Sequence, residues 1–137
     1  MLDSFSPFFM FRILIVDDDV DLLFLGSSLL KQRGFDVFSL SSVDEIFEIV
    51  QSFKPHVILL DVKLGDQDGR DICLELKGNP ETNFIKVILY SAFPETSVEY
   101  SKYGADDFVV KPYEFNHLVE RILHNLDRLP LTGNLKL

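Results

Sequence analysis

The sequence predicts an α/β domain in which five short strands alternate with five helices. Four runs of apolar residues lack polar alternation, as is typical of strands buried on both faces of a parallel sheet. The segments between these runs repeat apolar residues at three- and four-residue steps, which is the spacing of an amphipathic helix. This alternation predicts right-handed crossovers and a doubly wound (βα)5 sheet with helices on both faces.

Five segments are expected to form the strands. The fifth, residues 35–39, is more mixed than the other four because Asp36 and Ser39 interrupt it, as is usual near the edge of a sheet. It follows Gly34, a residue that often ends a helix. The four apolar runs are residues 13–16, 57–60, 87–90 and 108–110.

Five helices are expected between and after the strands. Residues 42–45 form a Ser-x-x-Glu capping box, which predicts the start of the second helix. The fourth, residues 94–103 before Gly104, has the weakest pattern. The other four are marked by Leu22, Leu25 and Leu29; by Ile46, Ile49, Val50 and Phe53; by Ile72 and Leu76; and by Phe115, Leu118, Val119, Ile122, Leu123 and Leu126.

Length and composition fit one domain. The 137 residues are 47% hydrophobic, which is enough for one core, and we expect an N-terminal extension at 1–10, a domain at 11–128 and a tail at 129–137. The net charge of −9 opposes direct binding to nucleic acid or to an anionic membrane. The only cysteine, Cys73, cannot form an internal disulfide, and no apolar run is long enough to span a bilayer. We therefore expect a cytoplasmic protein.

Chemically active side chains directly follow four of the expected strands. Asp17 and Asp18 follow the first strand, Asp61 the third, Ser91 the fourth and Lys111 the fifth. Because ligands bind at the carboxyl ends of such strands, we expect these side chains to converge. Taken singly, each aspartate could be a helix cap or a turn residue and the lysine a solvated surface amine. Their joint placement favours one site.

Three clustered carboxylates repel one another, so the site must take up a proton or recruit a cation. Their hard oxygen atoms favour Mg²⁺, with Mn²⁺ as the alternative. A divalent ion together with Lys111 would neutralise the three negative charges. The sequence therefore predicts a metal site that a phosphoryl donor could approach.

Four segments resemble the motifs of the response-regulator receiver family in order and spacing. They are ILIVDDDVDLL, HVILLDVKLGDQDG, VILYSA and GADDFVVKPY, and the resemblance covers about residues 11–127. It implies a flavodoxin-like fold with strand order 2-1-3-4-5. It also implies a two-component signalling protein that promotes its own phosphorylation and dephosphorylation rather than an enzyme acting on a separate substrate.

The resemblance assigns a role to each residue at the strand ends. Asp61 would accept a phosphoryl group from the phosphohistidine of a histidine kinase. Asp18 and Asp61 would ligate the metal directly, Asp17 would act through a water molecule, and Lys63 would contribute its backbone carbonyl. Lys111 would pair with the phosphoryl oxygens.

The resemblance further implies a switch pair, Ser91 and Phe108. The serine hydroxyl would move to hydrogen-bond the new phosphoryl group, and the phenylalanine would turn inward behind it. Phe108 could equally be an ordinary core aromatic. The bond between Lys111 and Pro112 is expected to be cis, again by resemblance.

The sequence departs from the family pattern at two positions where many relatives have proline, Val20 and Gly65. Neither change removes a reactive group. Gly65 would loosen the loop after the third strand, and Asp68-Gly69 would form its turn. The three histidines, His56, His117 and His124, are interpreted as structural.

Two other functions are weighed against phosphoryl acceptance. A phosphatase of the haloacid-dehalogenase type would need a second aspartate two residues after its nucleophile, where this chain has Lys63. The stronger alternative is a receiver-like module that binds proteins without phosphorylation, but the complete acidic set argues against it.

The expected partners are proteins. The resemblance implies a sensor histidine kinase or a histidine phosphotransfer protein as the donor, and a downstream target bound by the face of the fourth helix, fifth strand and fifth helix. A phosphorylation-linked homodimer is a further expectation. No DNA-binding segment follows the last expected helix, and both a stand-alone regulator and a piece of a larger protein remain open.

Overall fold

The computed structural model describes residues 9–93 and 99–127. Its central sheet has five parallel strands in the order β2-β1-β3-β6-β7, which confirms the predicted flavodoxin-like fold. All five residues of the central strand, β3, are buried. The strands are β1 (Arg12–Val16), β2 (Asp36–Leu40), β3 (Val57–Asp61), β6 (Lys86–Ser91) and β7 (Asp107–Val110).

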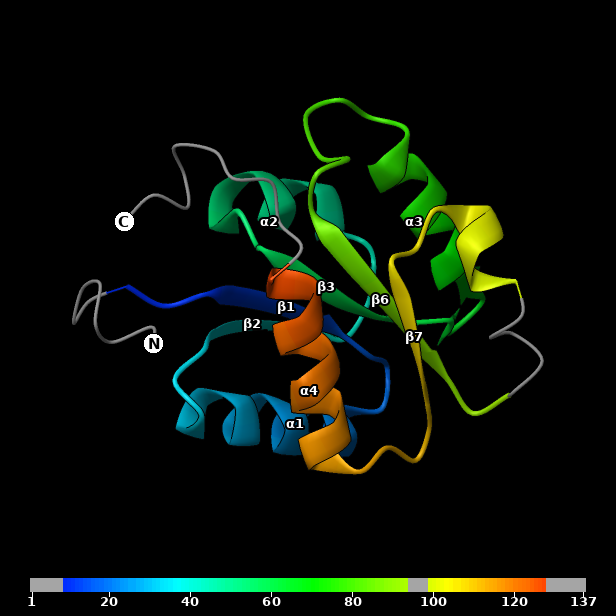
Figure 1. Ribbon diagram of the computed structural model, residues 1–137. Coiled ribbons are helices and arrows are strands. Elements are labelled where there is room, and N and C mark those ends of the chain that lie inside the picture. Colours follow the sequence, from blue (N-terminus) through cyan, green and yellow to red (C-terminus); the bar gives the residue numbers. More distant parts are fainter. Residues whose placement is uncertain (1–8, 94–98, 128–137) are drawn as a thin grey trace.

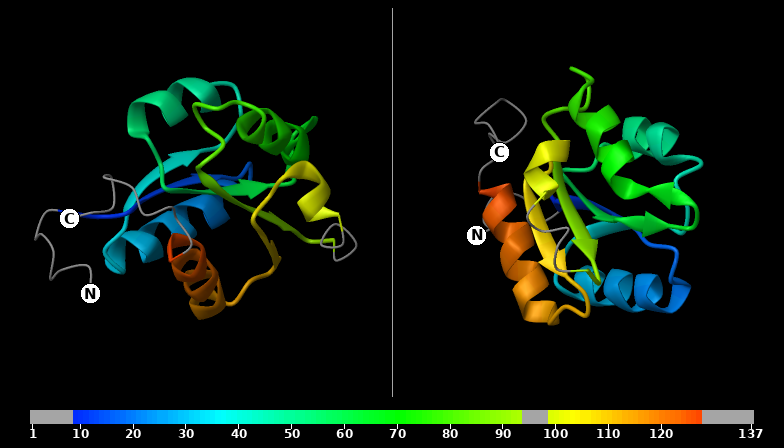
Figure 2. Two further views of the ribbon diagram at one scale, coloured as in Figure 1. Left: turned by 45° about the horizontal axis from the view of Figure 1, so that its top comes forward. Right: turned by 90° about the vertical axis from the view of Figure 1, so that its right-hand side faces the viewer.

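Two helices cover each face of the sheet (Figure 1, Figure 2). α1 (Val20–Gln32) and α4 (Phe115–Leu126) pack on one face, and α2 (Ile46–Phe53) and α3 (Gly69–Lys77) pack on the other. The sheet therefore separates two hydrophobic cores, which we call the α1/α4 core and the α2/α3 core. Within the described residues, no helix is long and apolar enough to cross a membrane.

The predicted capping box at residues 42–45 is wrong. α2 begins at Ile46, and its N-cap residue, Glu45, makes no side-chain capping hydrogen bond. The Ser42 Oγ atom instead accepts from the backbone N–H of Asp44 at 3.4 Å. The helix starts later because residues 44 and 45 form a turn in front of it.

The loop after β3 also differs from the prediction. Asp68 and Gly69 do not form its turn, because the Asp68 side chain caps α3 by accepting from the Arg70 N–H, and Gly69 is the first residue of that helix. The turn lies at Gly65, where φ is 62°, a conformation that suits glycine. It joins two short antiparallel strands, β4 (Lys63–Leu64) and β5 (Gln67–Asp68).

In the described part of the expected fourth helix, Tyr100–Tyr103 form a 3₁₀-helix, η3, which ends at Gly104 with φ of 81°. Residues 94–98, which would begin that helix, lie outside the described residues. The mixed segment 35–39 does form an edge strand, β2, as predicted, and it begins one residue later.

Candidate functional site

The predicted site residues meet at the carboxyl ends of the parallel strands. Asp17 and Asp18 follow β1, and Asp61 ends β3. Each of these carboxylates offers an oxygen, and the three oxygen atoms lie within 4.8 Å of one another. Asp17 and Asp61 are buried, whereas Asp18 is exposed. The structure thus forms the acidic cluster that the sequence predicted.

Lys111 lies between the two buried carboxylates. Its Nζ atom is 3.0 Å from the Asp61 Oδ2 atom and 3.2 Å from the Asp17 Oδ2 atom. Burial alone would lower the pKa of Lys111, but the hydrogen bond to Asp61 and the charges of both carboxylates raise it above its usual value. The lysine therefore stays charged, and the bond to Pro112 that follows it is cis, as expected.

Asp61 is 4% exposed. Burial raises its pKa to about 6, Lys111 acts in the opposite direction, and Asp17 raises the pKa further. The Asp61 Oδ1 atom accepts a long hydrogen bond of 3.4 Å from the Lys63 N–H. A carboxylate with this environment is costly to ionise, so a further positive charge would stabilise its ionised form.

Asp18 is held by the loop after β3. Its Oδ2 atom accepts a hydrogen bond of 2.9 Å from the backbone N–H of Gly65. A proline at this position has no N–H and could not make that bond. The departure from the family pattern at Gly65 therefore ties the loop to the acidic cluster rather than loosening it. Asp19, next along the chain, caps α1 through the Leu22 N–H.

The donor set suits a divalent cation. It consists of three carboxylates whose oxygen atoms lie within 4.8 Å of one another and one lysine, so its formal charge is negative. Carboxylate oxygens are the ligands that Mg²⁺ prefers in proteins. The cluster therefore fits the metal that the sequence predicted.

Comparison with known proteins agrees with the fold and with this cluster. Residues 13–123 match the family described as the response regulator receiver domain. The chain belongs to this family. The receiver resemblance drawn from the sequence motifs is therefore confirmed.

Relatives of this receiver include signalling proteins and solved receiver domains. The sensory transduction protein BceR of Halalkalibacterium halodurans is 31% identical over 122 residues, which cover 88% of this chain. A CheY-like receiver from Methanospirillum hungatei has a TM-score of 0.79 and 28% identity, over 87% of this chain and 95% of that one. The BeF3-activated receiver domain of DrrB has a TM-score of 0.75 and 30% identity, over 88% of this chain and all of that one (100%).

The receiver spans only part of its curated relatives. It covers 52% of BceR and 19% of the protein RcaC of Microchaete diplosiphon, to which it is 30% identical over 125 residues. The activities of those whole proteins are therefore not carried over to this chain.

The two residues of the expected switch pair lie on neighbouring strands. Ser91 ends β6 and is buried, and its Oγ atom accepts a hydrogen bond of 3.1 Å from the Phe93 N–H. Phe108 pairs with Leu89 in the sheet register, so it lies one strand away and two residues behind the serine. Its partly buried ring packs against the α2/α3 core and stacks on Tyr100 at 6.2 Å between ring centroids. Their movement remains a proposal.

Tyr90 is a site residue that sequence reasoning missed. Its hydroxyl donates to the Asp17 Oδ2 atom at 2.8 Å, and its ring lies 4.8 Å from the Lys111 Nζ atom. Burial first, and then the charge of Asp17, raises the pKa of Tyr90 well above its usual value, so the hydroxyl stays protonated. The only signal in the sequence is a hydroxyl-bearing residue at the end of an apolar run.

His56 has the structural role that was predicted. Its Nδ1 atom accepts from the backbone N–H of Arg12 at 2.9 Å. Burial, followed by the charge of Arg12, lowers its pKa to about 4. The neutral ring packs edge-on against Phe9 and Phe11. This contact lies at the start of β1, away from the acidic cluster.

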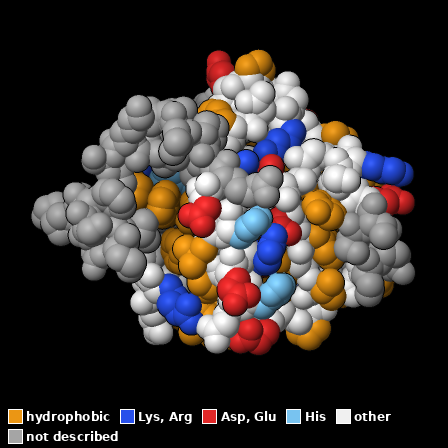
Figure 3. All heavy atoms as spheres, in the orientation of Figure 1, with side chains coloured by type: hydrophobic (Ala, Val, Ile, Leu, Met, Phe, Trp, Pro, Cys, Tyr) orange, Lys and Arg blue, Asp and Glu red, His pale blue; other side chains and the backbone are white. Residues whose placement is uncertain are grey.

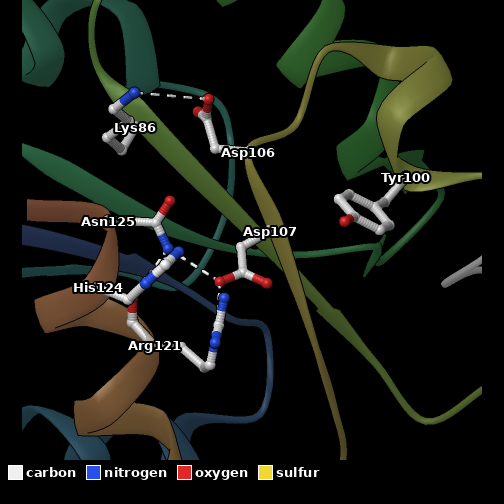
Figure 4. Close-up of a pocket in the computed structure, with 7 residues that line it drawn as sticks. All are labelled: Lys86, Tyr100, Asp106, Asp107, Arg121, His124 and Asn125. Atoms are coloured by element: carbon white, nitrogen blue, oxygen red, sulfur yellow. Dashed lines mark hydrogen bonds and ion pairs between the residues drawn. The ribbon is translucent and has the colours of Figure 1, made fainter. Parts of the chain in front are cut away.

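A hollow with a volume of about 260 Å³ lies at the opposite end of β7 from Lys111. Asp107 lines this hollow, is 8% exposed, and accepts from Arg121 at 2.7 Å and from Asn125 at 2.9 Å. Figure 3 shows charged side chains of both signs and histidines on this face of the molecule. Figure 4 labels the lining residues, which are Lys86, Tyr100, Asp106, Asp107, Arg121, His124 and Asn125. We interpret the hydrogen bonds of Asp107 as structural contacts that hold α4 against β7.

Proposed function

We propose that this receiver accepts a phosphoryl group on Asp61 from a phosphohistidine and then signals through a change of surface. The observation that carries the proposal is the position of the Lys111 ammonium group, 3.0 Å from Asp61 inside a cluster of three carboxylates. Phosphoryl transfer needs a positioned nucleophile and groups that offset the charge on the phosphoryl oxygens. The cluster has both.

In the proposed reaction an Asp61 carboxylate oxygen attacks phosphorus. The new O–P bond forms as the P–N bond of the donor breaks, and the electron pair of that bond goes to the imidazole nitrogen. The product is an acyl phosphate. Lys111 already lies beside Asp61, so it would only have to turn to reach the phosphoryl oxygens.

Mg²⁺ would be held by Asp18 and Asp61 directly, by Asp17 through a water molecule and by the Lys63 carbonyl, with Mn²⁺ as the alternative. When bound, the ion would offset the charge that gathers on the carboxylates and the phosphoryl group. The three carboxylates support this assignment through their mutual distances.

The output of the proposed switch would come from Ser91 and Phe108. Both lie at or beside the site, on β6 and β7, and Phe108 already stacks on Tyr100 of η3. An inward turn of Phe108 would break that stacking and change the surface formed by η3, β7 and α4. We propose this surface for a downstream protein target or a phosphorylation-linked homodimer, and a histidine kinase or phosphotransfer protein in the cytoplasm as the donor.

The test is intact-mass measurement after incubation with acetyl phosphate and Mg²⁺. Wild-type protein should gain one phosphoryl group, and Asp61→Asn should gain none because its amide is not a nucleophile. A sample with the metal removed should also gain none.

If no adduct forms, beryllofluoride binding tests whether the low reactivity of acetyl phosphate is the reason. A folded protein that neither gains a phosphoryl group nor binds beryllofluoride would contradict the proposal. It would favour the module that binds proteins without phosphorylation. An adduct that persists in Asp61→Asn would move the reaction to another residue.

A further inference from the structure

The Tyr90 hydroxyl reaches across the central strand of the sheet. Tyr90 lies on β6 and Asp17 follows β1, and β3 runs between these two strands. Asp61 is paired with Tyr90 in the sheet register, and the Tyr90 carbonyl accepts from the Val62 N–H at 3.0 Å. The Tyr90 side chain therefore spans from the strand beside Asp61 to the carboxylate on the far side of β3.

Asp17 depends on a small number of donors because none of its surface is exposed to water. Its Oδ1 atom accepts from the Asp19 N–H at 2.9 Å. Its Oδ2 atom accepts from the Tyr90 hydroxyl at 2.8 Å and lies 3.2 Å from the Lys111 Nζ atom. A buried carboxylate that loses a donor is left with an unpaired charge, which is costly.

The two groups that contact Asp17 Oδ2 would behave differently during the reaction. Lys111 is shared with Asp61 and would have to turn towards a phosphoryl group. Tyr90 is fixed by its strand, and its ring packs in the α1/α4 core. When Lys111 leaves, the tyrosine hydroxyl is the donor that remains on this oxygen among the described residues.

We propose that Tyr90 is a positioning residue for the metal site, an inference that rests on the proposed metal-dependent function. Its hydroxyl holds the Asp17 carboxylate in a fixed orientation, so that Asp17 can bind a water ligand of the metal. The same bond lets Lys111 turn without leaving Asp17 Oδ2 unpaired. Groups that orient metal ligands in this way often change metal affinity by tenfold or more when removed.

Tyr90→Phe isolates the hydroxyl. The variant keeps the ring, and with it the packing and the contact to Lys111. The chain also supplies a matched control in Tyr113, whose ring contacts that of Tyr90 at 6.0 Å between centroids. Within the described part of the chain the buried Tyr113 hydroxyl has no hydrogen-bond partner. Tyr113→Phe therefore removes a neighbouring buried hydroxyl without removing a hydrogen bond to any described residue.

The measurement is Mn²⁺ affinity without a phosphoryl donor, obtained from the electron paramagnetic resonance signal of the free ion. We expect Tyr90→Phe to raise the Kd by on the order of tenfold. Tyr113→Phe should leave it unchanged. The free energy of unfolding, measured by urea on each metal-free variant, shows whether packing has changed as well. A Tyr90→Phe protein that binds Mn²⁺ as tightly as wild type overturns the inference, whatever its stability.

Wild-type protein separates this inference from the function on which it rests. If wild type does not bind Mn²⁺, the proposed metal site fails, and the role of Tyr90 fails with it. If wild type binds and Tyr90→Phe binds equally well, only the role of Tyr90 fails.

A measurement on wild-type protein covers the case in which Tyr90→Phe does not fold. The four tyrosines can be labelled with ¹³C at Cζ, and the Tyr90 signal assigned by replacing the other three with phenylalanine one at a time. The chemical shift of the Tyr90 signal should change as Mg²⁺ is added, and half of the change should occur at the concentration that half-fills the site. A Tyr90 signal that does not respond overturns the inference.

Discussion

Asp61 is a buried carboxylate that titrates in an unusual range. Its pKa is raised from 3.8 to about 6, with burial as the largest cause. In the unfolded chain the same group has an ordinary pKa, so between about pH 4 and pH 6 the folded protein binds more protons than the unfolded protein. The contribution of Asp61 to stability is therefore present below about pH 4 and is lost as the pH rises through 6.

The direction of this pH dependence predicts how Asp61→Asn changes the stability of metal-free protein. At pH 7.5 the asparagine removes a costly buried charge, so the variant should be more stable than wild type, by at most about 3 kcal/mol for about two pKa units. At pH 4.5 the difference should shrink. Urea unfolding at both pH values in the presence of a chelator measures it.

The exposed Asp44 supplies the control for that experiment. Asp44→Asn removes the same formal charge from the surface and should change stability little at either pH. An Asp61→Asn variant that is less stable than wild type at pH 7.5 would show that the hydrogen bonds of the carboxylate outweigh the cost of its burial.

Gly69 shows how closely the first turn of α3 packs on β3. A Cβ atom at this position would lie 2.0 Å from the Asp61 carbonyl oxygen. The obstacle is backbone, so it cannot turn aside as a side chain could. The start of α3 and the end of β3 therefore hold one another in place.

Gly69→Ala should move one of these two elements. We expect a loss of stability of about 2 kcal/mol or more, since overpacking costs typically 1–3 kcal/mol, together with slower acetyl phosphate labelling of Asp61. Gly78→Ala, at the C-cap of the same helix, is the milder control. A Cβ atom there would lie 3.1 Å from the Leu74 carbonyl oxygen, which needs a shift of only a few tenths of an ångström, and the φ of Gly78 is −83°. Equal labelling rates for the two variants would contradict the expectation.

The sequence predicts elements well where one pattern decides them. Four of the five strands are recognisable because they are apolar runs, and the mixed edge strand β2 is recognisable from its position after Gly34. The strand ends then place Asp17, Asp61 and Lys111 without further information. The capping box at residues 42–45 is wrong because a local motif can yield to a turn. Tyr90 is missed because its hydroxyl contacts Asp17 across β3. That contact exists only when β1, β3 and β6 lie side by side, and no local pattern in the sequence indicates it.

At the scale of the whole molecule, metal binding should appear as stability. A cation that binds the folded acidic cluster and not the unfolded chain stabilises the protein by about 2.7 kcal/mol at a concentration 100 times its Kd. Mg²⁺ should therefore raise the unfolding temperature of wild type. The comparison must be made at matched ionic strength with Na⁺, because the net charge of −9 also gives a screening effect.

The variant with both Asp18→Asn and Asp61→Asn separates the two effects. Relative to Na⁺ at the same ionic strength, it should lose the increase that comes from Mg²⁺ bound at the acidic cluster and keep any increase that comes from Mg²⁺ on the surface charge. Equal increases in wild type and in the double variant would mean that Mg²⁺ acts on the surface charge alone.

The division of the interior by the sheet leaves the two faces free to diversify separately. Side chains of the α1/α4 core and those of the α2/α3 core contact different helices, and only the strand backbones are common to both. Substitutions that do not share partners are usually additive in their energies. A lineage could therefore exchange the residues on one face to recognise a new protein without adjusting the opposite face, while the strand ends, which both halves support, keep the same chemistry.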